Sequence, residues 1–289
     1  MTQEVTNYEK IKEELLGKEF KVLDKGFVRL VDVMGSDDSI VQAARVSYGK
    51  GTKTSLEDRG LIRYLMRHKH TTPFEMVEFK FHIKLPIFIA RQWIRHRTAN
   101  VNEYSGRYSE MPDDFYLPDL EQIRPQSTMN KQGRGDEAFE PARAEEIRNI
   151  MQNTQKNLFS EYEDLLEKEF ARELARINLP LSNYTEWYWK IDLHNLFHFL
   201  RLRIDSHAQY EIQQYGIVMA DIVSKITPYA WEAFSDYGID AIYFSKNEKA
   251  ALSELLSGKN AKDLDYKSIG LSKREAREFE EKITTLINK

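Results

Sequence analysis

The segment VEFKFHIKLPIFIARQWIRHR, residues 77–97, contains two periodicities in direct succession. Up to residue 85 apolar residues alternate with polar ones, which is typical of a strand with one face in a core. Pro86 suits the first turn of a helix, which we expect over residues 86–97, with arginines at its end and in the loop beyond. The apolar members of the strand are Val77, Phe79, Phe81, Ile83 and Leu85, and the polar members are Glu78, Lys80, His82 and Lys84.

The segments that precede this one add further strands and a helix. Residues 19–35 predict two short strands separated by a turn. Residues 55–70 predict a helix, because apolar residues recur at helical spacing after a capping pattern. The helix ends at Thr71-Thr72-Pro73, since the residue before a proline avoids the helical region. It therefore brings His68 and His70 to its C-terminal end.

The segments that follow predict longer helices. Residues 118–140 are polar and irregular and predict a surface loop, and residues 141–177 predict helix in two pieces. NYTEWYWKID, residues 183–192, alternates like a strand. Its last residue, Asp192, suits the N-cap of one long helix from Leu193 to about Ile226.

The C-terminal part of the chain is charged and contains two more capping patterns, Ser245 with Glu248 and Ser272 with Glu275. We therefore expect a single α/β domain over residues 1–240, with a loop insertion at 118–140, and a helical extension over residues 241–289.

Composition excludes several classes of function. The 289 residues are 41% apolar and carry a net charge of −4, which suits a globular protein rather than a general binder of nucleic acid or anionic membranes. The absence of cysteine excludes disulfides, thiolate–metal sites and a thiol nucleophile. No apolar run is long enough to cross a bilayer, and the polar start does not resemble a signal peptide. We expect a cytoplasmic protein.

Residues 91–110 carry a local excess of positive charge, with four arginines and a histidine. Arg91 and Arg95 lie one helical turn apart, and Arg97 and Arg107 flank a loop rich in hydrogen-bonding side chains. A planar guanidinium binds phosphate through two parallel hydrogen bonds, so the cluster suits a phosphate clamp. A solvated basic face with ordinary salt bridges explains the charge equally well, and both interpretations stay open.

The helix expected from Leu193 carries polar residues on two flanks of an apolar stripe. One flank holds His194, His198 and Arg201, and the other holds Arg203, His207, Tyr210 and Gln214. His194 and His198 have metal-ligand spacing, but HNLFH lacks the glutamate of an H-E-x-x-H pair. Polar residues that hydrogen-bond their neighbours are the simpler interpretation.

The order of residues in the arginine segment points to a family more specifically than its charge does. RHRTANVNEYSGRY, residues 95–108, resembles the R-H-R-x7-S signature of the flavin-dependent thymidylate synthases. Four further segments resemble that family in its order, so that the similarity spans about residues 20–235: HTTPFE, PIFIARQW, ARINLPL and LRIDSHAQYEIQQY. The chain departs from the family at Asn100, where serine is usual. It also departs at Asp192, His194 and His198, where some members have asparagine or arginine.

The resemblance implies an enzyme that makes thymidylate (dTMP) from deoxyuridylate (dUMP). The carbon donor would be 5,10-methylenetetrahydrofolate, and NADPH would be the reductant through bound FAD. The implied fold is α/β of the α+β type, with a central, mostly antiparallel sheet and long helices. The implied assembly is a homotetramer whose sites are shared between subunits. The lack of cysteine agrees, because the flavin rather than a thiolate would then supply the difficult chemistry.

The resemblance also implies the residues of the site, and no metal. Arg203 would be catalytic, stabilising negative charge that develops on the uracil ring. The residues implied for deoxyuridylate are Gln92, Trp93, Ile94, Arg95, Glu103, Tyr104, Ser105, Gly106, Arg107, Arg176 and Arg203. Those implied for FAD are His70, Thr72, Glu75, Arg95, His96, Arg97, Glu103, Asp192, Leu193, His194 and His198.

Three further side chains have open roles. The Ser105 hydroxyl is a conceivable nucleophile, but no paired base is apparent, so positioning the nucleotide is the simpler role. We expect His207 to orient the surroundings of Arg203, and His82 to be structural or solvent-facing.

Two other functions fit parts of the sequence. A metal-dependent phosphohydrolase would use His194 and His198 with carboxylates such as Asp192, and would lose activity with a chelator. An RNA-binding module would use the arginines on phosphates and aromatic rings on bases, with affinity that falls steeply with salt. The acidic net charge counts against the second.

Overall fold

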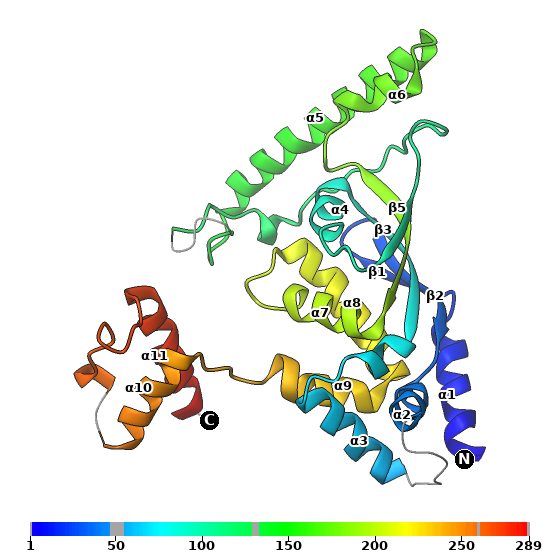
Figure 1. Cartoon of the computed structure of the whole chain (residues 1–289). Coiled ribbons are helices and arrows are strands. Elements are labelled where there is room, and N and C mark those ends of the chain that lie inside the picture. Colours follow the sequence, from blue (N-terminus) through cyan, green and yellow to red (C-terminus); the bar gives the residue numbers. More distant parts are fainter. Residues whose placement is uncertain (1, 47–54, 129–132, 259–260, 288–289) are drawn as a thin grey trace. The chain divides into compact units, whose positions relative to one another are not determined.

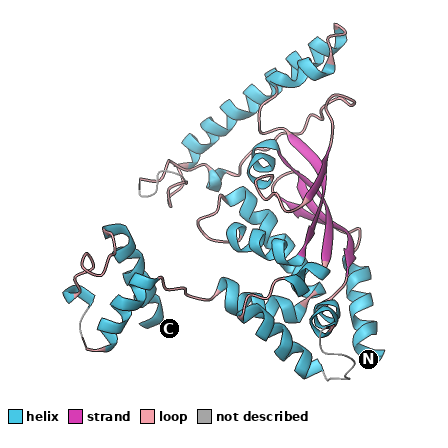
Figure 2. Ribbon diagram, in the orientation of Figure 1, coloured by secondary structure: helices cyan, strands magenta, loops and turns pink. Residues whose placement is uncertain are grey.

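The strand predicted at residues 77–85 forms the centre of a five-stranded sheet (Figure 2). The structure is a computed structural model, which describes residues 2–46, 55–128, 133–258 and 261–287. The strand order is β1-β2-β3-β5-β4, and every neighbouring pair is antiparallel, as predicted. The strands are β1 (Glu19–Val22), β2 (Gly26–Met34), β3 (Glu78–Pro86), β4 (Asn100–Glu103) and β5 (Tyr184–Asp192).

One face of the sheet is apolar and covered by helices. Phe81 pairs with Trp189 across β3 and β5, and both side chains are buried. Figure 1 shows α4 (Ile87–Trp93), α7 (Leu193–Arg203) and α8 (Tyr210–Ile226) against the sheet. On the opposite face the ring of His82 stacks on Tyr188, 4.8 Å between centroids, and bonds Glu186 at 2.8 Å. His82 therefore has a structural role, as expected.

Further helices surround this core. They are α1 (Thr2–Leu15), α2 (Asp37–Arg45), α3 (Ser55–Arg67), η1 (Thr72–Met76), η2 (Leu120–Gln122), α5 (Pro141–Glu167), α6 (Arg172–Ala175), η3 (Arg176–Asn178) and α9 (Pro228–Phe234). The segment predicted as helix in two pieces forms α5 and α6, with a turn between them. Within the described residues, no helix combines the length and the apolar character that a membrane span requires.

The prediction of one long helix over residues 193–226 is wrong. The chain forms α7 and α8, and residues 204–209 turn between them. The side chain of Gln213 holds the turn by donating to the carbonyls of Ile204 and Asp205 at 3.2 and 2.9 Å. Gly216 lets α8 lie close to the end of α7, because a Cβ there would lie 3.2 Å from Cγ2 of Ile204.

Two smaller expectations near the arginine segment also need correction. Pro86 ends β3 and is the N-cap of α4, rather than part of the first helical turn. The helix ends at Trp93, and the loop expected beyond it contains the edge strand β4. In the loop predicted at 118–140, residues 129–132 lie outside the described residues.

The chain divides into two compact units, residues 1–234 and 235–289. The second contains η4 (Ser235–Ile239), α10 (Lys246–Leu256), η5 (Ala261–Asp263) and α11 (Lys273–Ile287). Its core is formed by Ala251, Leu264, Leu271 and Phe279. Both predicted capping patterns are present: Ser245 Oγ accepts from the Glu248 amide at 3.3 Å, and Ser272 Oγ accepts from the Glu275 amide at 3.4 Å.

Candidate active site

The arginine segment is anchored by a buried tryptophan at the end of α4. Trp93 is fully buried, and its ring lies 4.6 Å from Phe199 of α7 and 5.3 Å from Trp189 of β5. The Trp93 carbonyl accepts from the His96 amide at 2.9 Å, which closes a turn. The chain then leaves the core as residues 94–108, which we call the signature segment. Trp93 is therefore an anchor, and the side chains after it form the site.

The central contact of the site joins His96 to Arg203, the last residue of α7. Nε and Nη2 of Arg203 lie 3.2 and 3.0 Å from Nε2 of His96. Burial, followed by the charge of Arg203 and then His198, lowers the pKa of His96 to about 4. A guanidinium only donates, so Nε2 must be the unprotonated acceptor. His96 is thus neutral and holds Arg203 in place.

The start of α7 is tied to the signature segment by hydrogen bonds. Asp192 caps the helix as predicted, and its carboxylate accepts from the Asn195 amide at 2.9 Å. The Thr98 hydroxyl donates to Oδ1 of Asn195 at 2.9 Å. The adjacent Leu193 is fully buried, so its side chain packs in the core.

His194 and His198 lie one turn apart on α7, and the ring of His198 is 6.0 Å from that of His96. Burial lowers the pKa of His198, and the nearby Arg201, His194 and Arg203 add to the effect. A histidine with a lowered pKa is neutral at pH 7. Within the described residues, no group of three or more histidines and carboxylates is arranged to hold a metal ion.

The edge strand β4 presents Glu103 beside β5. The Thr185 hydroxyl, which is buried, donates to Oε1 of Glu103 at 2.9 Å. The Tyr104 amide donates to the carbonyl of Glu186 at 2.8 Å, and its hydroxyl to the carbonyl of Glu110 at 2.6 Å. The backbone and a buried hydroxyl thus hold the Glu103 carboxylate in one place.

The serine–glycine turn brings Arg176 to the signature segment. A Cβ on Gly106 would lie 2.6 Å from Sδ of Met111 and 3.1 Å from Cδ of Arg176, so only glycine fits without displacing a neighbour. The Ser105 hydroxyl accepts from the Arg107 amide at 3.4 Å. Nε of Arg107 donates to Glu173 of α6 at 3.1 Å, and both side chains are exposed.

The residues from the HTTPFE segment lie at the start of α7. The amide of Leu193 donates to the carbonyl of Val77 at 2.8 Å, which places η1, with Thr72 and Glu75, beside the helix. Phe74 fixes this arrangement from the core side, 6.5 Å from Phe197. His70 precedes η1 and is exposed.

The signature segment adjoins two cavities. The first, of about 200 Å³, lies beneath it, with Trp187 and Trp189 as aromatic walls and His96 and Arg97 among its polar ones. The second, of about 500 Å³, is lined by Arg107 and by residues of α5 and α6.

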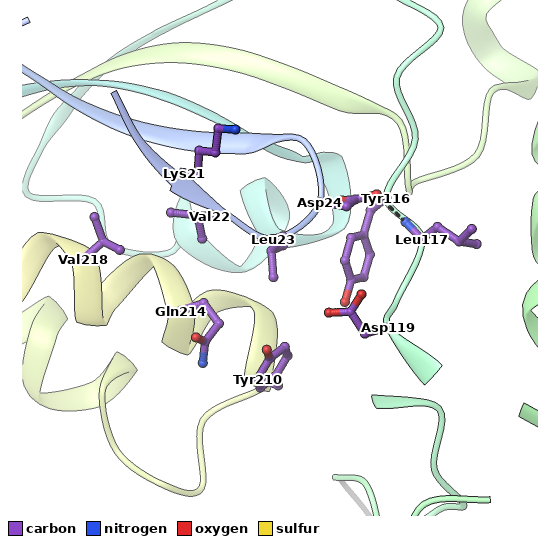
Figure 3. A pocket seen from close by; sticks show the side chains of 10 residues that line it. All are labelled: Lys21, Val22, Leu23, Asp24, Tyr116, Leu117, Asp119, Tyr210, Gln214 and Val218. Atoms are coloured by element: carbon purple, nitrogen blue, oxygen red, sulfur yellow. Dashed lines mark hydrogen bonds between the residues drawn. The ribbon is translucent and has the colours of Figure 1, made fainter. Parts of the chain in front are cut away.

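Figure 3 shows a third cavity, of about 270 Å³, between the β1–β2 turn and α8. It is lined in part by Asp24, Tyr116, Tyr210 and Gln214. The break between α7 and α8 therefore places Tyr210 and Gln214 away from the flank predicted for Arg203.

The structure brings together some of the predicted residues and leaves others apart. His96 with Arg203, and Gly106 with Arg176, are in contact. Between these two groups, the described residues form no hydrogen bond. His207 bonds Asp205 at 2.8 Å rather than the surroundings of Arg203. Thr98, Thr185 and Asn195 were missed, because short polar side chains without a repeating pattern give no signal in the sequence.

The fold and site define a class: a mixed α/β protein whose arginines and neutral histidines suit an anionic aromatic ligand. The family model described as "Thymidylate synthase complementing protein" matches residues 29–229. A flavin-dependent thymidylate synthase of Treponema denticola is 55% identical over 268 residues, which are 93% of this chain and 98% of the relative. The enzyme of that name from Ehrlichia ruminantium (strain Gardel) is 54% identical over 267 residues, covering 92% and 89%.

Solved structures agree with these relatives. The UMP/dUMP methylase PolB of Streptomyces cacaoi, bound with 5-Br dUMP, superposes with a TM-score of 0.69 at 34% identity, over 76% of this chain and 98% of that one. The chain belongs to the thymidylate synthase complementing protein family, whose members include the flavin-dependent thymidylate synthases. The family, the fold class and the flavin-dependent thymidylate synthase function predicted from the sequence are thereby confirmed.

Proposed function

We propose that the protein methylates deoxyuridylate reductively where the signature segment meets the end of α7. FAD would be the flavin, NADPH its reductant, and 5,10-methylenetetrahydrofolate the carbon donor. The observation that carries the proposal is the contact between neutral His96 and Arg203 within the segment that bears the family signature. The cytoplasmic location stays a prediction.

Arg203 is oriented for a two-point contact with the uracil ring. Its Nε and Nη2 donate to His96, which leaves the Nη1 donors for a ligand. Burial lowers the pKa of Arg203, yet its ordinary value is so high that the guanidinium stays charged at pH 7. A fixed, charged donor at a uracil carbonyl stabilises negative charge that develops there. We therefore assign this role to Arg203.

The nucleotide phosphate would be bound by Arg107 and Arg176 at the serine–glycine turn. Gly106 brings its backbone close to Arg176, so an anion at the turn reaches both. Arg107 is exposed and paired with Glu173, so phosphate must compete with that pair. Arg95, which is exposed just after α4, would also reach the phosphate. An exposed pair is weak, on the order of 1 kcal/mol or less, and yields to a phosphate that accepts two hydrogen bonds.

Ser105 supports positioning rather than nucleophilic attack. Within the described residues, no imidazole or carboxylate is hydrogen-bonded to its hydroxyl, and an unactivated hydroxyl is a weak nucleophile. Its oxygen accepts from the Arg107 amide instead. The hydroxyl would thus orient the turn that faces the phosphate.

The residues present fit a flavin. Trp187 and Trp189 give the first cavity flat walls, and Nε1 of Trp187 is buried without a hydrogen-bond partner. Arg97, His194 and His198 supply donors for a dinucleotide, with Thr72 and Asp192 at the start of α7. The bound flavin, once reduced by NADPH, would supply a hydride. The protein would bind and orient it through these side chains.

The first cavity is too small for the whole cofactor. At about 200 Å³ it is smaller than the roughly 300–1,000 Å³ usual for pockets that hold drug-sized ligands. A single chain thus supplies part of the site, which supports a homotetramer with shared sites. His70, exposed beside η1, would then face flavin and folate at the junction between subunits.

The test is the absorbance spectrum of the purified protein under anaerobic conditions. We expect bound flavin, bleaching on addition of NADPH, and a change in bleaching rate with deoxyuridylate. Thymidylate should form only when methylenetetrahydrofolate is added. A protein that is colourless and cannot be reconstituted with FAD would contradict the proposal.

A further inference from the structure

A buried glutamate lies at the start of α8, outside the residues assigned so far. Glu211 is 1% exposed. Its Oε1 accepts from the Tyr116 hydroxyl at 2.9 Å, and its Oε2 accepts from the Gln209 side-chain amide at 2.9 Å. A buried carboxylate is costly unless it is paired and hydrogen-bonded, so its partners matter.

The cationic side chain that pairs with Glu211 comes from the loop at residues 118–140. Nη2 of Arg134 donates to Oε1 of Glu211. The same guanidinium donates through Nη1 to Gln122 at 3.1 Å and lies 5.6 Å from the centre of the Tyr210 ring. Arg134 is thereby fixed from three directions. The loop that the proposed function leaves unexplained thus supplies the positive charge for a buried acid.

The carboxylate is connected to the candidate nucleotide site through Gln209. The Gln209 amide nitrogen donates to Glu211, and its amide oxygen accepts from the side chain of Gln92 on α4. Gln92 lies one residue before the anchor Trp93. The chain of contacts therefore runs from the loop to α8, then to the turn after Arg203, and ends at α4.

We infer that Arg134 is a positioning residue for deoxyuridylate: by neutralising Glu211 it keeps Gln209 oriented, and Gln209 holds the amide of Gln92 toward the nucleotide. The inference rests on the proposed function, since Gln92 binds nucleotide only there. The inference gives the loop a role in substrate affinity rather than in chemistry. No residue of this chain of contacts, which we call the relay, touches the reacting atoms.

The physical reason is the direction of the Gln209 amide. A carboxylate accepts only, so Glu211 forces the Gln209 nitrogen toward itself and leaves the oxygen for Gln92. Without Arg134 the buried acid has no cation beside it, and it moves toward water. Gln209 then loses its fixed acceptor. Gln92 then rotates, and the nucleotide loses a hydrogen bond.

The experiment compares deoxyuridylate affinity of flavin-loaded variants by titration calorimetry. R134M and Q209A should each raise the dissociation constant roughly tenfold, the loss expected for one hydrogen bond. Because both act on one relay, the double variant should bind about as weakly as either single variant, not roughly a hundredfold more weakly. R134K, which keeps the charge, should recover part of the affinity.

The matched control is R124M, from the same loop. Arg124 donates to the backbone carbonyls of Glu121 and Asp136 and not to Glu211. It should bind deoxyuridylate within about twofold of the wild type. Flavin absorbance and melting temperature, measured on all variants, separate a local loss of affinity from general damage.

The outcomes distinguish this inference from the proposed function. Wild-type protein that binds no deoxyuridylate overturns both. Wild-type binding with unchanged affinity in R134M overturns the inference alone, as does strict additivity in the double variant. If R134M does not fold, Q209A decides, because Gln209 is exposed and its truncation leaves Glu211 paired with Arg134. Normal affinity in Q209A then overturns the inference.

Discussion

The substitution Gly106→Ala tests whether the serine–glycine turn binds the nucleotide phosphate through Arg176. The added Cβ would lie 2.6 Å from Sδ of Met111, and 3.1 and 3.2 Å from Cδ and Nη1 of Arg176. Met111 is buried against Tyr162 and Ala175, so it has little room to move. Arg176 is only partly buried, and it gives way.

The expected cost has two parts. Overpacking of this kind costs roughly 1–3 kcal/mol, which for a unit of this size lowers the melting temperature by about 2–12 °C. Displacement of Arg176 removes a charge-assisted hydrogen bond to phosphate, worth roughly 1.5–3 kcal/mol, so the dissociation constant of deoxyuridylate should rise about ten- to a hundredfold. Flavin content should stay unchanged.

Thermal unfolding and titration calorimetry measure the two effects, with Gly60→Ala as the control. Gly60 lies in α3, and nothing lies within 4 Å of a Cβ placed there. Alanine should stabilise that helix by roughly 0.5–1 kcal/mol and leave nucleotide affinity unchanged. If Gly106→Ala keeps wild-type affinity for deoxyuridylate, the reasoning about Arg176 is refuted, whatever happens to the melting temperature.

Three further predictions follow from single residues. Arg203→Lys should keep the fold and flavin but lose most turnover, because an ammonium cannot make the two-point contact; near-normal turnover would contradict its role. The pKa of His96 is about 4 in the folded protein and 6.5 in a free histidine, so the stability of the protein should fall as pH drops from 6.5 to 4. Thermal unfolding should show a smaller fall in His96→Gln. Burial raises the pKa of Asp37 from 3.8 to about 6, so its contribution to stability should decline as pH rises across that range. Asp37→Asn should lose this dependence and cost roughly 1–3 kcal/mol in urea titrations, since Asp37 accepts from two amides of α9.

Sequence predicts the central strands and three helix N-caps well, because these depend on local pattern. β3 and β5 alternate over nine residues each, with one face in the core. The cap at Asp192 and the boxes of the C-terminal unit depend on neighbours three residues away. By contrast, all four residues of β4 are exposed, so no alternation marks it. Only its pairing with β5, over 80 residues away, makes it a strand.

The geometry of the site was less predictable, for a related reason. The motif assigned His96 to the flavin, and the structure adds that it accepts from Arg203 across 107 residues of sequence. The relay through Glu211 gave no signal either, since a glutamate near a helix start is usually exposed and caps the helix dipole. Its burial depends on Tyr116 and Arg134, which come from separate parts of the chain.

The break between α7 and α8, which sequence reasoning missed, separates the two functions that we assign to this region. Arg203 ends α7, and its side chain points back along the helix to His96, whose ring lies 4.9 Å from Phe199 and 6.0 Å from His198. That contact depends on α7 alone, whereas the turn at 204–209 brings Gln209 within reach of Gln92. Lengthening α7 by one turn should therefore separate Gln209 from Gln92 and leave Arg203 on His96. The local break thus supports the relay that we infer to position the nucleotide, independently of the candidate catalytic arginine.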